Sequence, residues 1–109
     1  MKIIFTLLFV LTVLVSKAQK VDSIFFNLYT DSLKKGVYNY INVDGKLSNG
    51  IYQPLMSDEV TFTSSGGRWD GNSIIIDSSF DKPAIYITVK LKSNPSVSKS
   101  VTIFIKNKT

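Results

Sequence analysis

The chain has 109 residues, 44% of them hydrophobic, and carries a formal net charge of +5. It contains no cysteine and no histidine, which excludes disulfides, thiolate or imidazole catalysis, and metal sites built from those side chains. The length predicts a single domain. Since few acid–base groups remain, and Glu59 is the only glutamate, we expect no enzymatic activity and no cofactor.

The first 18 residues have the three-part pattern of a secretory signal peptide. Lys2 gives a positive start, residues 3–15 form an apolar run, and Ser16 and Ala18 place small residues where a signal peptidase reads the chain. A helix over that run would span roughly 20 Å, which is short of the ~30 Å hydrocarbon core of a bilayer. We therefore expect a cleaved signal over residues 1–18, a domain over residues 19–109, and a secreted or periplasmic protein without a membrane anchor.

Positive charge is scattered along the rest of the chain. Loss of Lys2 and Lys17 with the signal lowers the net charge from +5 to +3, and the only adjacent basic pair is Lys34-Lys35. Nucleic-acid binding usually shows a basic cluster or stripe, so we expect no nucleic-acid partner. Ser32 and Lys35 have the spacing of a catalytic Ser-x-x-Lys pair, but Gly36 leaves no room for the helix that such a pair needs.

The next part of the chain predicts short strands separated by turns. Apolar β-formers favour strands over residues 23–30 and 37–43, the second closed by a turn at Asp44-Gly45. Residues 47–55 are rich in turn formers and predict an irregular crossover with a short edge strand. Strands over 59–64 and 73–77 follow, and the three isoleucines of the latter fit a strand covered on both faces.

The C-terminal part predicts a β-hairpin of residues 84–92 with 97–106, joined by a turn around Pro95. Apolar residues alternate with polar ones in both strands, so one face should point into a core. The expected core face, with Val60 and Phe62 approaching it from the opposite side, consists of Ile85, Ile87, Val89, Val101, Ile103 and Ile105. The outward set is Tyr86, Lys90, Phe104 and Lys106, which Tyr38 and Tyr40 would join if their strand lies nearby.

Six or seven short strands with turn signals every 8–12 residues are typical of a small all-β sandwich or barrel. Three stretches, 43–47, 60–67 and 85–89, together with a turn at Gly71, resemble bacterial immunoglobulin-like domains of the invasin/intimin type. The resemblance covers about half of the chain after the signal. It implies a small antiparallel immunoglobulin-like sandwich that serves as a secreted binding or spacer module. The segment 47–59 is longer than in such modules, and no tandem repeat is present.

Two groups of residues are candidates for a binding surface. Arg68 and Trp69 follow two glycines and precede an Asp-Gly turn, which indicates an indole and a guanidinium together on a loop; the alternative is a core tryptophan entering the next strand. Tyr86 and Phe104 have outward parity on the predicted hairpin, where exposed aromatic rings indicate an interaction surface and cross-strand pairing is the alternative.

Carboxylates near the Asp70-Gly71-Asn72 turn, with Asp77 and Asp81 following, have the oxygen ligands that Ca²⁺ prefers. Their spacing does not match an EF-hand loop, and a simple hairpin turn is the favoured interpretation, with no metal.

The sequence therefore predicts an exported, non-catalytic immunoglobulin-like module of the bacterial envelope or secretome, binding an unidentified protein or glycan. The alternative is a small exported ligand carrier or inhibitor with a cavity inside a sandwich or barrel. The oligomeric state stays open.

Overall fold

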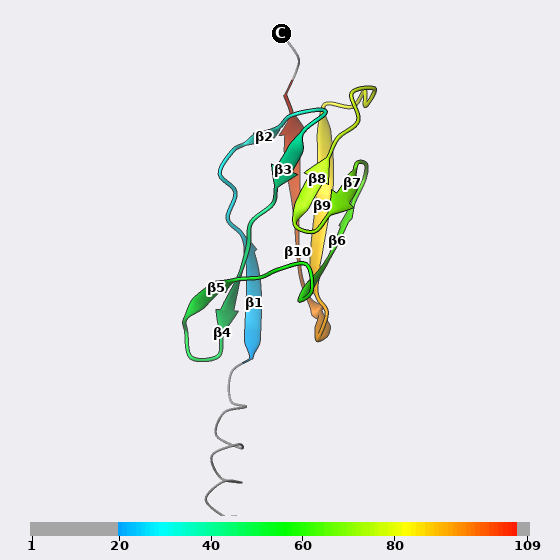
Figure 1. Cartoon of the computed structure of the whole chain (residues 1–109). Helices are drawn as coiled ribbons and strands as arrows, with labels where there is room; N and C mark the ends of the chain where they lie inside the picture. Colours follow the sequence, from blue (N-terminus) through cyan, green and yellow to red (C-terminus); the bar gives the residue numbers. More distant parts are fainter. Residues whose placement is uncertain (1–19, 107–109) are drawn as a thin grey trace, which may run out of the picture.

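The computed structural model describes residues 20–106, in which every regular element is a β-strand (Figure 1). The predicted signal peptide lies outside these residues. No helix in the described part is long and apolar enough to cross a membrane. The strands are β1 (Val21–Phe26), β2 (Ser32–Leu33), β3 (Tyr38–Tyr40), β4 (Val43–Leu47), β5 (Tyr52–Pro54), β6 (Val60–Ser64), β7 (Arg68–Asp70), β8 (Ser73–Ile75), β9 (Ala84–Leu91) and β10 (Asn94–Ile105).

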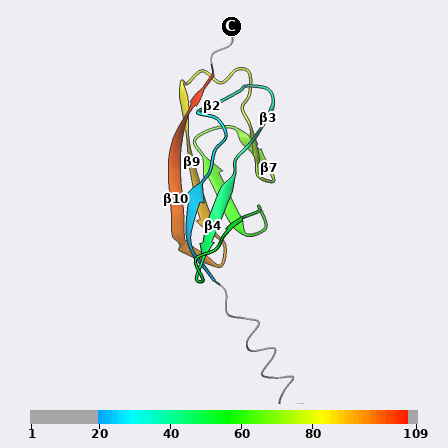
Figure 2. The same ribbon diagram turned by 90° about the vertical axis from the view of Figure 1, so that its left-hand side faces the viewer.

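These strands form three sheets, with the orders β1-β4-β5, β3-β8-β7 and β2-β10-β9-β6. Strands β3 and β4 follow each other along one extended segment, so the two three-stranded sheets continue one another. Figure 2 shows this composite sheet on one side of the molecule and β9 and β10 on the other. All strand pairs are antiparallel except the short pairing of β2 with β10.

The core between the two layers is aliphatic. In the long strands β9 and β10, buried β-branched residues or leucines alternate with exposed ones, so these strands bury a single face. The segment of β8 is covered on both faces, as its three isoleucines predict, because Ile74, Ile75 and Ile76 are all buried. A fully buried side chain of this kind stabilises the fold by about 1.5–3 kcal/mol. The buried cluster consists of Ile24, Leu33, Ile41, Val43, Leu55, Val60, Ile74, Ile76, Ile85, Ile87, Val89, Leu91, Ile103 and Ile105.

The predicted C-terminal hairpin is confirmed in its pairing and its parity. Ile87 lies opposite Val101 and Ile85 opposite Ile103, and all four point toward the core, although Val101 is only half-buried. Strand β10 begins at Asn94, inside the predicted turn, because an irregularity between Asn94 and Ser98 lets the pairing resume beyond Pro95.

The expected position of Val60 and Phe62 is wrong. Both residues lie in β6, which pairs with β9, so that Val60 is opposite Leu91 and Phe62 is opposite Val89. Val60 and Phe62 therefore extend the same core face sideways instead of meeting it from across the core. The opposing face comes from the composite sheet.

The predicted turn at Asp44-Gly45 is also wrong, because both residues lie inside β4. Gly45 is buried, and a Cβ on it would come within 3.0 Å of the side chains of Leu55 and Val21. Glycine is needed here for close packing and not for a turn. The chain turns instead at Asn49-Gly50, where Gly50 has a φ of 88° and the Ile51 N–H donates to Asn49 Oδ1 at 3.0 Å.

The first predicted strand is shorter than expected. Strand β1 ends at Phe26, and residues 32–33 of the predicted polar break form β2. The short edge strand expected within residues 47–55 is present as β5, and the expected hairpin turn at Gly71 joins β7 to β8 with a φ of 60°.

Candidate functional site

Trp69 lies in strand β7 and not at a loop tip. Its ring stacks on Phe62 from the other layer, with centroids 4.5 Å apart and an angle of 14° between the planes. The indole Nε1–H donates to Ser64 Oγ at 3.0 Å. A half-buried ring with its N–H satisfied closes the side of the core between β6 and β7. The structure therefore favours the core alternative for Trp69.

Arg68 points away from Trp69, because neighbouring residues of a strand face opposite sides of the sheet. The sequence-based prediction of an indole and a guanidinium acting together on a loop is wrong for this reason. Arg68 is exposed on the outer face of the composite sheet, opposite Ile75 of β8. Its guanidinium makes no hydrogen bond or ion pair with any residue from 20 to 106.

Tyr86 and Phe104 lie on the outer face of the four-stranded sheet, as predicted. Their exposed fractions are 53% and 66%. Tyr86 is paired with Thr102, so Phe104 lies diagonally across from it on the neighbouring strand. Farther along the same face, the hydroxyls of Thr88 and Ser100 are 2.8 Å apart. This face offers two rings beside a row of hydroxyl groups.

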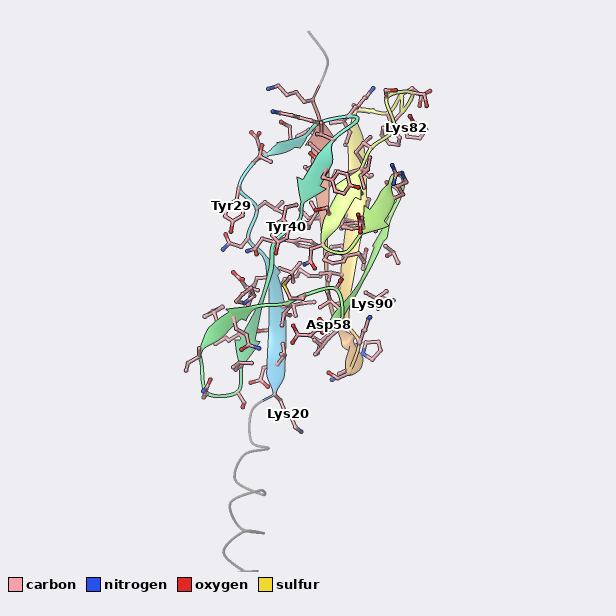
Figure 3. All side chains as sticks on the ribbon, viewed as in Figure 1. Lys20, Tyr29, Tyr40, Asp58, Lys82 and Lys90 are labelled. Carbon is pink, nitrogen blue, oxygen red and sulfur yellow. The ribbon has the colours of Figure 1, made fainter. Side chains whose placement is uncertain are left out.

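Tyr38 and Tyr40 do not join that face. They point outward from β3, in the other layer, because β3 pairs with β8 and not with the C-terminal hairpin. Tyr29 is also exposed, and the backbone N–H of Asn27 donates to the carbonyl of Asn42, which holds the loop after β1 beside the end of β3. Figure 3 labels Tyr29 and Tyr40 in this region of the composite sheet.

A surface hollow of about 570 Å³ lies at the end of β8, beside β7 and the turn before β3. It combines two isoleucines with one cation and one carboxylate, a combination that recurs in ligand sites. Its lining residues are Gly36, Gly67, Arg68, Ile75, Ile76, Asp77 and Ser78. Sequence reasoning singled out only Arg68 for binding and Asp77 for a metal. The hollow was missed because three separate segments build it.

The carboxylates considered for Ca²⁺ do not gather at one point. No group of three acidic side chains that could hold a metal ion occurs within residues 20–106. Asp77 instead accepts a hydrogen bond from Ser79 Oγ at 3.1 Å, and Asn72 is buried and donates to the Leu55 carbonyl at 3.1 Å. The hairpin-turn interpretation is confirmed at Gly71, which lies in the turn between the antiparallel strands β7 and β8.

No protein-family model matches the sequence, and no curated protein matches it.

Proposed function

We propose that this chain is an exported, non-catalytic binding module of the bacterial envelope or secretome, with an immunoglobulin-like sandwich fold. The strand order supports the fold. One layer runs β1, then the segment of β3 and β4, then β8 and β7, as strands A, B, E and D do in immunoglobulin domains, while β6, β9 and β10 match strands C, F and G. Strand β5 is an addition in the long segment between B and C.

The observation that carries the binding function is the exposure of aromatic side chains. All five tyrosines and Phe104 are exposed, with exposed fractions between 46% and 79%. Tyrosine supplies rigid contact area at little entropic cost and is enriched at interfaces. Because Trp69 packs inside, we propose two separate candidate surfaces: Tyr86 and Phe104 on the outer face of the four-stranded sheet, and Arg68 on the outer face of the composite sheet, on the opposite side of the molecule. The partner is a protein or a glycan.

The runner-up function, a ligand carrier, needs space between the layers. Close packing argues against that space at buried Gly45, and the chain is also tightly packed at Gly67 near the surface. A Cβ on Gly67 would come within 3.1 Å of the side chains of Ile74 and Ile76, as one on Gly45 would with Leu55. If the protein were a carrier, an apolar fluorophore would bind between the layers. Its binding would change the fluorescence of Trp69.

The test uses cells that produce the full chain. We expect the protein in the periplasm or medium, with an N-terminus at Gln19 or Lys20, and we expect it to bind a component of the envelope extract. Replacing Tyr86 and Phe104 together with alanine should weaken that binding by about tenfold or more, since paired aromatic anchors often dominate an interface. The melting temperature should stay within ~2 °C of the wild type, because both rings are exposed.

Replacement of Thr61 and Thr63 with alanine is the matched control, since both are exposed residues of the same sheet and should not change binding. An intact Met1 in the membrane fraction would contradict export. Binding that survives loss of Tyr86 and Phe104 and also survives loss of Arg68 would contradict both candidate surfaces.

A further inference from the structure

The middle isoleucine of β8 forms the floor of the hollow beside Arg68. Ile74 and Ile76 belong to the core, whereas Ile75 lies outside the core cluster and is still only 8% exposed. Its direct neighbours across the sheet are Tyr38 on β3 and Arg68 on β7. These two long side chains flank Ile75 on the outer face. Arg68 lines the hollow, whereas Tyr38 lies on the neighbouring strand beside it and supplies the larger exposed apolar area.

The polar groups at this hollow have opposite charges and are not paired with each other. Arg68 and Asp77 both line it, but their charged groups lie beyond ion-pair distance, and no residue from 20 to 106 bonds the Arg68 guanidinium. Ser79 occupies only Oδ2 of Asp77. The guanidinium offers donors and the carboxylate offers an acceptor, so a ligand here must both accept and donate hydrogen bonds.

The walls of the hollow are held by backbone contacts. The Gly36 N–H donates to the Ile76 carbonyl at 2.7 Å, and the Phe80 N–H donates to the Asp77 carbonyl at 3.0 Å. Lys35 Nζ reaches the Phe80 carbonyl and ties the turn after β8 to the turn before β3. A site whose walls are fixed before binding loses less entropy when a ligand arrives.

One class of ligand satisfies all of these features. A sugar hydroxyl both donates and accepts, so neighbouring hydroxyls can serve Arg68 and Asp77 at once. The C–H face of a pyranose ring is apolar and suits the exposed ring of Tyr38 beside the hollow. A hollow of about 570 Å³ falls in the size range of small-molecule sites.

We propose that the hollow between Arg68 and Asp77 binds a saccharide unit of an uncharged glycan. This proposal rests on the binding function proposed above and narrows its partner to a glycan. Arg68 donates to ring hydroxyls, Asp77 accepts from them, and the ring of Tyr38 contacts the C–H face. Because the two charges cancel, the site has no preference for an anionic sugar.

The test titrates the secreted protein with methyl glycosides of glucose, galactose, mannose and N-acetylglucosamine, and with their tetrasaccharides, while amide NMR shifts are recorded. At least one saccharide should shift the amides of Gly36, Ile75 and Asp77. Arg68→Ala and Asp77→Asn should each lower its affinity by about tenfold or more, since each removes a charge-assisted hydrogen bond. Tyr38→Phe should keep the affinity within about twofold, whereas Tyr38→Ala should not.

Asp70→Asn is the matched control, because Asp70 is the other exposed charged residue of β7 and pairs with Ser73, outside the hollow. It should leave the affinity unchanged. Binding of glycylglycine in place of saccharides would overturn the proposal, because a zwitterion also fits two opposite charges. Saccharide shifts confined to Tyr86 and Phe104 would overturn this site and leave the binding function standing. If no saccharide binds but the protein still binds the envelope extract, the saccharide site is wrong and the binding function stands. If the protein binds neither, both proposals are wrong.

Discussion

At the scale of single residues, Gly45 shows how the absence of a side chain lets neighbouring residues pack directly against the backbone of a strand. It lies in the middle of β4 with its α-carbon under Leu55 and Val21. We expect Gly45→Ala to lower the free energy of unfolding by about 1–3 kcal/mol, the usual cost of overpacking a core. Urea unfolding measures this. Lys46→Ala, at the exposed neighbour, should change stability by less than ~0.5 kcal/mol, and an equal loss in both variants would contradict the packing argument.

Trp69 joins the two layers at the side of the core. Trp69→Ala removes the ring stacked on Phe62 and the partner of Ser64, and we expect it to cost about 3 kcal/mol. Trp69→Phe keeps a stacked ring and loses only the hydrogen bond, so it should cost about 1 kcal/mol. Thermal unfolding followed by circular dichroism compares the two. If Trp69→Ala melts with the wild type, the indole is not part of the core.

These two residues also show what the sequence could not reveal. Asp-Gly is a favoured turn pair, and glycines before Trp69 favour a loop, because local propensity does not register what packs above a residue. Neighbouring residues of a strand face opposite sides, so recognising β7 would have placed Arg68 and Trp69 on different faces. A strand of three residues is too short for its pattern to be recognised in the sequence. The hollow depends on β3, β7 and β8 meeting, and no local signal specifies that pairing.

At the scale of elements, the C-terminal hairpin is where the sequence was most informative, because long alternating strands fix their own parity. The same parity carries a prediction. Ile87 and Ile103 are almost completely buried in the core, and truncation to alanine at either position should cost roughly 2–4 kcal/mol through the cavity left behind. Val101→Ala should cost less, since Val101 is half-buried. Unchanged melting temperatures in the first two variants would contradict the register.

Strand β10 has a largely unpaired edge, and a lysine on it discourages pairing with another chain. On the side away from β9, the described residues of β10 pair with another strand only at Phe104 and Ile105, which pair with β2, while β1 lies nearby without pairing. Lys99 is paired with buried Val89, so it starts on the inner face, and its Nζ lies 5.2 Å from the centroid of the Phe25 ring. An inward-pointing charge on an edge strand discourages another chain from pairing there.

We therefore expect Lys99→Val to make the protein associate as its concentration rises, which sedimentation velocity would detect. Lys90→Val is the control. Lys90 lies on β9 between two paired strands, so this substitution removes the same charge without exposing a strand edge. Association of both variants to the same extent would point to lost charge and not to the edge of β10. A monomeric Lys99→Val would show that the edge is protected by something else.

At the scale of the whole molecule, the extended segment of β3 and β4 joins the two three-stranded sheets. Strand β3 ends at Tyr40 and β4 begins at Val43, and Ile41 and Asn42 between them are buried. Through this segment, the two three-stranded sheets face the same four-stranded sheet across one core. The sequence predicted this segment as one strand and a turn, and it could not indicate that its two halves take different partners.

This continuity predicts a single cooperative unfolding transition. A small domain with one shared core usually unfolds without populated intermediates. The chain has one tryptophan, so fluorescence reports on β7 and the contact with Phe62, while far-ultraviolet circular dichroism reports on all strands together. The two signals should give the same urea midpoint, and amides of β4 and β8 should exchange hydrogen with similar free energies of opening. A fluorescence midpoint that differs from the dichroism midpoint, or β4 amides that open well before those of β8, would mean that the sheet of β1, β4 and β5 unfolds independently.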